Sequence, residues 1–207
     1  RRHLSKWLRK HRVKTPMALA GARSYIHYEP KGVVLIIAPW NYPFQLSIAP
    51  LIGSIAAGNC SVLKPSEYAP HTAALLSQII GSHFDHSYLA VIQGDAQIGE
   101  ALLHERFDYI FFTGSAAIGK MVMAAAARHL TPVTLELGGK SPCIIDQDAN
   151  IEQAARRIAF GKFLNAGQTC IAPDYLLVHA SNIQRLRESI ETYVKRFYGN
   201  NPRKSPD

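Results

Sequence analysis

The stretch Tyr109-Ile110-Phe111-Phe112-Thr113-Gly114-Ser115-Ala116-Ala117-Ile118-Gly119 contains the features that decide the fold. Its first five residues form an apolar, aromatic run typical of a strand, and a helical pattern starts after a Gly-Ser turn. Free amides at the helix N-terminus, together with the Ser115 hydroxyl, would form an anion site that suits a pyrophosphate. An ordinary helix cap is the alternative, because Gly114 and Gly119 do not make a GxGxxG pattern.

Strand-like and helix-like segments alternate around this stretch. The strand-like runs are short and apolar on both faces, as parallel strands covered on both sides are. They occupy residues 33–38, 61–64, 89–93, 109–113 and 133–137. Apolar residues at helical spacing fill residues 44–57, 70–83, 97–104 and 116–129. The alternation predicts an α/β fold with a doubly wound, Rossmann-like parallel sheet.

A second unit is predicted after Gly138 and Gly139. Its expected order is a strand at 143–146, a helix at 151–163, a loop with Cys170, a strand at 175–179 and a helix at 183–197. We therefore expect two domains, residues 1–137 and 138–207. Before the first sheet, residues 22–28 alternate as an antiparallel strand would.

Composition narrows the class of protein. The chain has 207 residues, of which 47% are hydrophobic and 18% charged, as in globular proteins. No apolar run approaches the ~18–20 residues of a membrane span. Three scattered cysteines, without CxxC or a His/Cys cluster, indicate neither a disulfide framework nor a zinc site. From this cysteine pattern we expect no metal and a reducing compartment. No signal peptide is visible, so we expect a cytoplasmic location.

Positive charge is concentrated at the N-terminus. The net charge is +8, and the first fourteen residues hold seven positive side chains and no acid: Arg1, Arg2, Lys6, Arg9, Lys10, Arg12 and Lys14. The remainder carries only about +1, which argues against a nucleic-acid-binding protein. We expect a basic helical arm whose Leu4, Trp7 and Leu8 pack on the rest of the protein, with docking on a membrane as the alternative.

Two polar stretches follow predicted strands, at the sheet edge where α/β proteins bind ligands. In Lys64-Pro65-Ser66-Glu67, Lys64 could donate to ribose hydroxyls or a 2′-phosphate and Glu67 could accept from ribose hydroxyls; a surface ion pair is the alternative. In Pro39-Trp40-Asn41-Tyr42-Pro43, the prolines restrict the backbone and Asn41 offers an amide donor, although a turn needs no function.

The cysteines differ in their surroundings. Cys60 and Cys143 lie in strand-like runs, where free cysteine is usually a small buried apolar residue. Cys170 follows Leu164-Asn165-Ala166-Gly167-Gln168-Thr169, a polar stretch behind a helix-like run, where its sulfur can face a cleft. Glu136 lies earlier, in an apolar run that ends on two glycines. A nucleophile and a candidate base in one chain argue for covalent catalysis.

Five of these stretches, in order and spacing, resemble the aldehyde dehydrogenase superfamily. They are Pro39-Trp40-Asn41-Tyr42-Pro43, Lys64-Pro65-Ser66-Glu67, Phe112-Thr113-Gly114-Ser115, Leu135-Glu136-Leu137-Gly138-Gly139-Lys140-Ser141-Pro142 and Gly167-Gln168-Thr169-Cys170. The similarity runs from about Leu4 to Asp207. Pro173 and Ser24-Tyr25-Ile26 look closest to the class 3 and fatty or aromatic aldehyde branch.

The resemblance implies oxidation of a small hydrophobic or aromatic aldehyde to a carboxylic acid with NAD(P). It implies Cys170 as the nucleophile, Asn41 with the Cys170 amide as oxyanion donors, and Glu136 as the base that hydrolyses a cysteine thioester. Its cofactor site comprises Trp40, Lys64, Glu67, Gly114, Ser115, Ile118, Gly119 and Leu137. Repulsion between Glu67 and a 2′-phosphate favours NAD, with NADP as the alternative.

The resemblance also implies a homodimer or larger homo-oligomer, with residues 22–28 in an oligomerisation sheet. It further implies a catalytic domain that is incomplete at residue 207. Two other hypotheses stay open. One is a catalytically incompetent truncated form that binds a dinucleotide or another subunit, and the other is a nucleic-acid-binding protein that rests on the basic arm alone.

Overall fold

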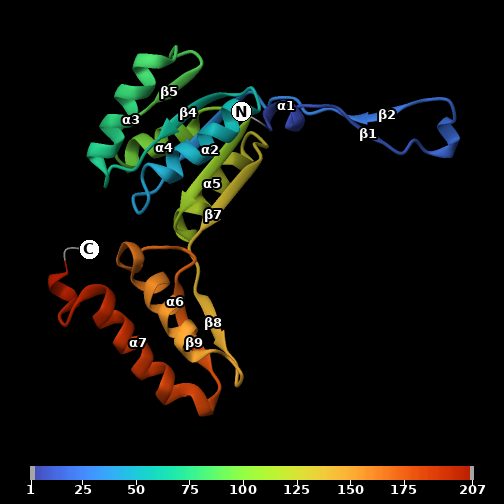
Figure 1. Ribbon diagram of the computed structural model, residues 1–207. Coiled ribbons are helices and arrows are strands. Elements are labelled where there is room, and N and C mark those ends of the chain that lie inside the picture. Colours follow the sequence, from blue (N-terminus) through green and yellow to red (C-terminus); the bar gives the residue numbers. More distant parts are fainter. Residues whose placement is uncertain (1–2, 206–207) are drawn as a thin grey trace. The chain divides into compact units, whose positions relative to one another are not determined.

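The structure is a computed structural model that describes residues 3–205 (Figure 1). The chain forms two compact units, which divide between Glu136 and Leu137. The first unit includes residues 3–136 and the second includes residues 137–205. The domain roles predicted from the sequence stay predictions.

The described part of the first unit is built on a five-stranded sheet with the order β5-β4-β3-β6-β7. The strands are β3 (Val33–Ile37), β4 (Cys60–Lys64), β5 (Leu89–Val91), β6 (Tyr109–Gly114) and β7 (Val133–Leu137). The pairs β3–β4, β3–β6 and β4–β5 are parallel. Successive strands are added on one side of β3 and then on the other, so the sheet is doubly wound. The predicted fold class is confirmed.

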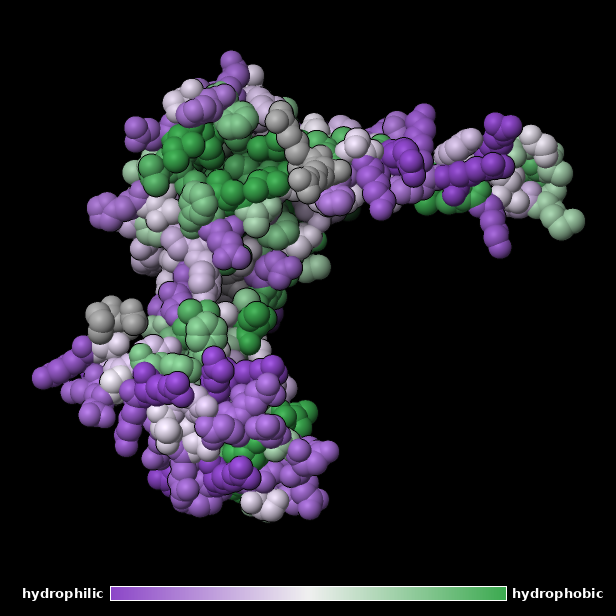
Figure 2. Space-filling model, in the orientation of Figure 1, coloured by the Kyte–Doolittle hydropathy of each residue, from purple (hydrophilic) through white to green (hydrophobic). Residues whose placement is uncertain are grey.

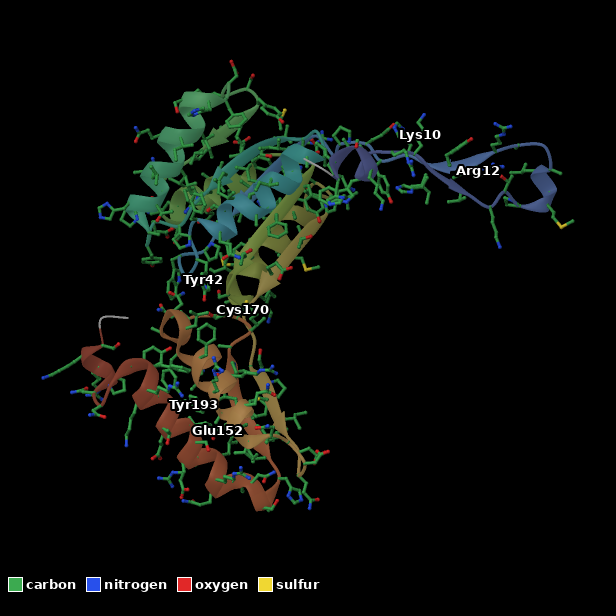
Figure 3. The ribbon with its side chains drawn as sticks, viewed as in Figure 1. Lys10, Arg12, Tyr42, Glu152, Cys170 and Tyr193 are labelled. Carbon is green, nitrogen blue, oxygen red and sulfur yellow. The ribbon has the colours of Figure 1, made fainter. Side chains whose placement is uncertain are left out.

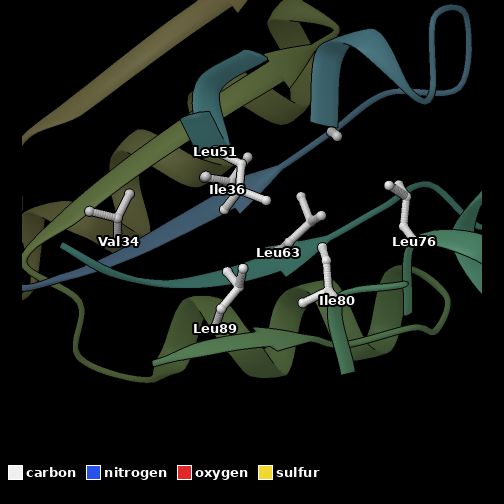
Figure 4. Close-up of a cluster of buried hydrophobic side chains, with 8 residues drawn as sticks. Val34, Ile36, Leu51, Leu63, Leu76, Ile80 and Leu89 are labelled. Atoms are coloured by element: carbon white, nitrogen blue, oxygen red, sulfur yellow. The ribbon is translucent and has the colours of Figure 1, made fainter. Parts of the chain in front are cut away.

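Helices cover both faces of this sheet: α2 (Gln45–Ala56), α3 (Pro70–His83), α4 (Ala96–His104) and α5 (Ala116–Ala127). Side chains of β3 alternate between two cores, as the pleat of a strand requires. On the face of α2 and α3, the buried cluster is Val34, Ile36, Ala38, Leu51, Leu63, Leu76, Ile80 and Leu89 (Figure 4). On the face of α5, the buried cluster is Leu35, Phe107, Ile110, Phe112, Val122 and Ala126.

The N-terminal segment corrects one prediction. The expected basic helix is limited to α1 (Leu4–Trp7), and β1 (His11–Val13) pairs antiparallel with β2 (Ser24–Ile26). Trp7 and Leu8 are 64% and 46% exposed and do not pack as expected, whereas Leu4 is half-buried. A longer helix would bring Lys6 and Lys10 within one turn of each other, where like charges repel. Arg1 and Arg2 lie outside the described residues.

The two strands of this hairpin are joined by a connecting segment. A short helical turn, η1 (Met17–Leu19), lies between β1 and β2, and the observed β2 is shorter than the predicted strand at 22–28.

Within residues 3–205, no helix combines the length and the apolar character needed to span a bilayer.

The second unit pairs a small parallel sheet with two helices. Strands β8 (Ser141–Ile145) and β9 (Pro173–Val178) are parallel, and helices α6 (Ile151–Phe163) and α7 (Ile183–Tyr198) pack together. Short turns lie at η2 (Leu164–Gly167), η3 (Ala180–Asn182) and η4 (Pro202–Lys204). The buried core is Ile145, Ile151, Ala155, Ile158, Ala159, Leu186 and Tyr193. The surface of this unit that Figure 2 shows is largely hydrophilic.

A half-buried polar contact joins the two helices. The Tyr193 hydroxyl donates to Oε1 of Glu152 over 2.7 Å, and the two side chains point toward each other (Figure 3). This hydrogen bond, burial and the negative charge of Glu152 together raise the pKa of Tyr193. The contact therefore fixes how α7 packs on α6.

Candidate active site

The three turns that were predicted to bind a ligand follow strands β3, β4 and β6 at one edge of the first sheet. Ile37 at the end of β3 lies in register with Lys64 of β4 and with Phe112 of β6. The strands are parallel, so their carboxyl ends are aligned, and the turns after them begin side by side. The strand order reverses between β3 and β6, which is where doubly wound sheets bind ligands. The fold thus brings together the Trp40–Asn41 turn, Lys64 with Glu67, and Gly114 with Ser115.

Lys64 is buried in this edge. Its side chain is 5% exposed, and its Nζ lies 3.1 Å from Oε2 of Glu67, whose side chain is 31% exposed. Nζ also donates to the carbonyl of Pro65 over 3.3 Å. Burial opposes the charge on Glu67, but its backbone hydrogen bond and its contact with Lys64 outweigh burial, and the pKa of Glu67 is lowered. The pair is therefore charged and partly withdrawn from solvent.

The turn after β6 presents donors for an anion. Ser115 caps α5, where its Oγ accepts from the Ile118 amide over 3.3 Å. Ile118 and Ser115 are exposed, whereas Gly119 is buried inside α5. The other first-turn amides of a helix have no intrahelical acceptor, so they are available to a ligand.

Thr113 is a residue that the sequence reasoning missed. Its Oγ1 is buried, and among the described residues it is the one buried side-chain polar atom without a hydrogen-bond partner. An unsatisfied buried hydroxyl costs about 1–3 kcal/mol, so a water molecule or a ligand group is expected to bond to it. The signal was present in the sequence, because Phe112 faces the core and Thr113 must face the opposite side. This hydroxyl, the helix amides and Lys64 fit the hydroxyl and phosphate groups of a dinucleotide.

The turn after β3 is held by α2. Ser47 is fully buried, and its hydroxyl donates to the carbonyl of Pro43 over 2.6 Å. Trp40 is 48% exposed and Asn41 is half-buried. The side chains of this turn are thereby placed on a backbone that is anchored at both ends.

Glu136 and Leu137 end β7, and both are exposed. Glu136 is the last residue of the first unit, and Leu137 is the first residue of the second unit. Asn41 and Glu136 thus belong to the first unit and Cys170 to the second. The described residues contain no group of three or more His, Cys, Asp or Glu side chains that could hold a metal ion.

Cys170, labelled in Figure 3, is exposed. Cys60 and Cys143 are half-buried rather than fully buried as expected. The loop before Cys170 turns through three left-handed residues, Asn165, Ala166 and Gly167, with φ of 51°, 53° and 76°. A Cβ on Gly167 would lie 2.9 Å from the carbonyl oxygen of Lys162, at the end of α6. Glycine is required at this position, because its φ disfavours a side chain and the close approach of the Lys162 carbonyl leaves no room for one.

The exit of the loop is fastened to the start of β8. The Ser141 hydroxyl donates to the backbone carbonyl of Cys170 over 3.3 Å. A Cβ on Gly139 would lie 3.2 Å from the same oxygen, so the absence of a side chain permits this approach. Asp174 forms ion pairs with Lys140 over 3.3 Å and with Lys162 over 3.8 Å. No role was predicted for Ser141 or Asp174 from the sequence.

Comparison with known proteins identifies the family. The sequence model of the aldehyde dehydrogenase family matches residues 2–206 of this chain. The chain belongs to the aldehyde dehydrogenase family. Relatives named as family 3 members also match, which confirms the resemblance to the class 3 branch.

Two relatives show how far the similarity extends. The chain is 52% identical over 207 residues to the 4,4'-diaponeurosporen-aldehyde dehydrogenase of Staphylococcus aureus, covering 100% of this chain and 45% of the relative. It is 55% identical over 183 residues to the dimeric NADP-preferring aldehyde dehydrogenase of Mus musculus, covering 88% of this chain and 40% of the relative. This aldehyde dehydrogenase family chain therefore spans less than half the length of these curated relatives.

Solved structures agree with this family assignment. A substrate-bound Staphylococcus aureus AldH has a TM-score of 0.95 and 51% identity, covering 100% of this chain and 45% of that one. A Mycobacterium tuberculosis aldehyde dehydrogenase complexed with NAD+ has a TM-score of 0.81 and 32% identity, covering 90% and 38%.

Proposed function

We propose that this chain carries the nucleophile and most of the cofactor site of an NAD(P)-dependent aldehyde dehydrogenase. The observation that carries the proposal is Cys170, an exposed cysteine in a loop fastened at both ends, in a chain of this family. The reaction converts an aldehyde to a carboxylic acid through intermediates bound to Cys170.

In the first step, the Cys170 thiolate attacks the aldehyde carbonyl carbon and forms a C–S bond. The carbonyl electron pair moves to oxygen, and the Asn41 amide and the Cys170 backbone N–H stabilise the resulting oxyanion. Donors of this kind contribute about 3–4 kcal/mol each to the transition state. A bound nicotinamide dinucleotide would supply the hydride acceptor that allows the thiohemiacetal on Cys170 to become a thioester.

In the second step, Glu136 takes a proton from water, and the hydroxide attacks the thioester carbon. The C–S bond breaks, the carboxylic acid leaves, and the Cys170 thiolate is restored. Without a base, the acyl group would need another acceptor, such as coenzyme A. Glu136 therefore favours a hydrolytic dehydrogenase over an acylating one.

The proposed dinucleotide site lies at the shared edge of β3, β4 and β6. Lys64 and Glu67 would face the adenosine ribose, while Gly114, Ser115, Ile118 and Gly119 would form the site at the helix N-terminus. Trp40 and Leu137 complete the proposed set. We expect NAD to be preferred, with NADP as the alternative; one relative is named NADP-preferring and one similar structure holds NAD+.

The substrate class and assembly follow from the family. We propose small hydrophobic or aromatic aldehydes as substrates and a cytoplasmic location. We also propose a homodimer or larger homo-oligomer that uses the β1–β2 hairpin, on which Tyr25 and Ile26 are 50% and 47% exposed. One relative is named as dimeric.

The test compares cysteine variants of the complete polypeptide that carries these residues. Cys170→Ser is expected to abolish NADH formation with an aldehyde panel, whereas Cys60→Ser and Cys143→Ser should keep it. Limiting iodoacetamide followed by peptide mass analysis should label Cys170 first, because it is the exposed cysteine. Full activity of Cys170→Ser, or preferential labelling of Cys143, would overturn the assignment.

A second candidate is a catalytically incompetent form that binds a dinucleotide or another subunit. The chain spans 45% of the staphylococcal relative's length. We expect residues 1–207 by themselves to show no aldehyde turnover, since alignment of bound reactants can contribute ~7–11 kcal/mol and depends on a complete site. NADH production is compared with that of the complete polypeptide at matched thiol content. Turnover within about tenfold would reject this candidate.

A further inference from the structure

The backbone carbonyl of Cys170 is held by a side chain from another element. Ser141 stands at the first position of β8 and donates its hydroxyl to this carbonyl over 3.3 Å. Gly139, two residues earlier, lies so close that an added Cβ would sit 3.2 Å from the same oxygen. The carbonyl of Cys170 therefore has a donor on one side and a closely approaching backbone on another.

The chain after Cys170 is tied to the same strand by independent contacts. Ser141 is in register with Pro173, and Lys140 pairs with Asp174 over 3.3 Å. The amide of Ala172 donates to the carbonyl of Thr169 over 3.1 Å, which closes a tight turn around Cys170. Removing one hydroxyl would leave these contacts in place, so loss of the Ser141 hydrogen bond should not release the loop.

The chain before Cys170 is equally restricted. Gly167 lies against the carbonyl of Lys162, and the left-handed turn at Asn165 and Ala166 reverses the chain directly after α6. With both ends fixed, the main freedom left to Cys170 is rotation about its own backbone bonds. The Ser141 hydrogen bond opposes this rotation, because turning the carbonyl away would break it.

We propose that Ser141 is a positioning residue for Cys170. Its hydroxyl fixes the ψ angle of Cys170 and thereby the direction of the Cα–Cβ bond that carries the sulfur. The inference rests on the proposed role of Cys170 as nucleophile. It adds that a side chain from the Gly-Gly-Lys-Ser segment orients this nucleophile. Ser141 donates to the backbone carbonyl of Cys170 and is not assigned a contact with substrate.

We expect loss of the Ser141 hydroxyl to change the kinetics of the enzyme rather than the stability of the whole fold. Misplacing a reacting group by ~1 Å can cost up to about 10²-fold in rate. Ser141→Ala should therefore lower kcat about tenfold or more, while the KM for the cofactor stays within about twofold. The rate of Cys170 alkylation by iodoacetamide in the folded protein should change in parallel with kcat, whereas alkylation after denaturation should not.

The experiment uses the complete polypeptide and three variants. Ser141→Ala removes the donor, and Ser141→Thr keeps a hydroxyl on a residue that suits a strand. Ser189→Ala is the matched control, because Ser189 also donates a hydrogen bond in the second unit, to Glu152, away from the Cys170 loop. Each is measured for kcat, KM, alkylation rate and thermal midpoint. We expect Ser141→Thr to recover to within about threefold of the parent and Ser189→Ala to match it.

Three outcomes would overturn the inference: Ser141→Ala with a kcat within about twofold of the parent, equal losses in Ser141→Ala and Ser141→Thr, or a loss that follows the thermal midpoint alone. A parallel Cys170→Ser variant separates this failure from failure of the proposed function. If Cys170→Ser is inactive and Ser141→Ala is fully active, only the positioning role is lost. If Cys170→Ser is active, the nucleophile assignment fails first.

Discussion

Replacing Glu67 with glutamine is the sharpest test of the proposed dinucleotide site at the shared edge of β3, β4 and β6. The substitution removes one negative charge but leaves an oxygen that can still accept from Lys64. In the structure, that ammonium lies 3.1 Å from the carboxylate and is almost fully shielded from solvent. A hydrogen bond to a charged group contributes about 1.5–3 kcal/mol, and a neutral acceptor gives roughly half of that. We therefore expect Glu67→Gln to lower the free energy of unfolding by about 1 kcal/mol.

The same variant should change cofactor preference. A like charge near a 2′-phosphate costs on the order of 1–4 kcal/mol at a protein surface. Glu67→Gln removes that repulsion and leaves the Lys64 ammonium without a charged partner. The ratio of kcat/KM for NADP to that for NAD should rise tenfold or more, where tenfold corresponds to ~1.4 kcal/mol.

The pH dependence gives an internal check. The folded state lowers the pKa of Glu67 from its ordinary value of 4.5, so the pair stabilises the protein above that value. This stabilisation is lost as the pH falls through the lowered pKa. Urea unfolding should thus separate the parent from Glu67→Gln at neutral pH, and the difference should disappear in acid.

Glu105→Gln is the matched control, since Glu105 is an exposed glutamate of the same unit. It should change neither stability nor cofactor ratio. An unchanged NADP/NAD ratio in Glu67→Gln would refute the placement of Glu67 at the ribose. An unfolding difference that persists unchanged in acid would refute the ion-pair argument.

Three further outcomes are expected. Glu136→Gln should give a stoichiometric burst of NADH followed by slow turnover, since an amide cannot take the water's proton; loss of the burst would show that Glu136 acts earlier. Tyr193→Phe should lower the thermal midpoint without changing kcat, because its hydroxyl joins α7 to Glu152 of α6; an unchanged midpoint would contradict this. Gly167→Ala should destabilise by at least the ~1–2 kcal/mol of a left-handed residue and reduce kcat, measured by urea unfolding and NADH formation; full stability would show that the loop can rearrange.

Local signals in the sequence were enough to place most elements. The helices at 70–83 and 151–163 have the predicted bounds, because Pro70 occupies the first helical turn and Asn150 caps α6 by accepting from the Gln153 amide. The β1–β2 hairpin was foreseen only in part, because β2 lies within the strand predicted at 22–28 and β1 was not predicted. Its strands pair His11 with Ile26 across a connection that carries no strong turn signal, and the basic residues resembled an exposed helix face.

The candidate site was likewise predicted in part from the sequence. The segments after β3, β4 and β6 were identified because each follows an apolar run, and parallel strands place such turns at one edge. The burial of Lys64, the unpaired Thr113 hydroxyl and the hydrogen bond from Ser141 to Cys170 depend on packing and register. Such contacts join residues far apart in the chain, so no local pattern reveals them.

The burial of Lys64 has a chemical consequence for an enzyme proposed to handle aldehydes. Aldehydes condense with accessible lysine amines to form Schiff bases, and an exposed lysine would be modified by the enzyme's own substrate. Lys140 is 82% exposed and open to this reaction, whereas the Lys64 side chain is 5% exposed and covered by its neighbours. The cation proposed to bind the cofactor is thereby shielded from adduct formation, and sustained exposure to aldehyde should modify the surface lysines while leaving the dinucleotide edge intact.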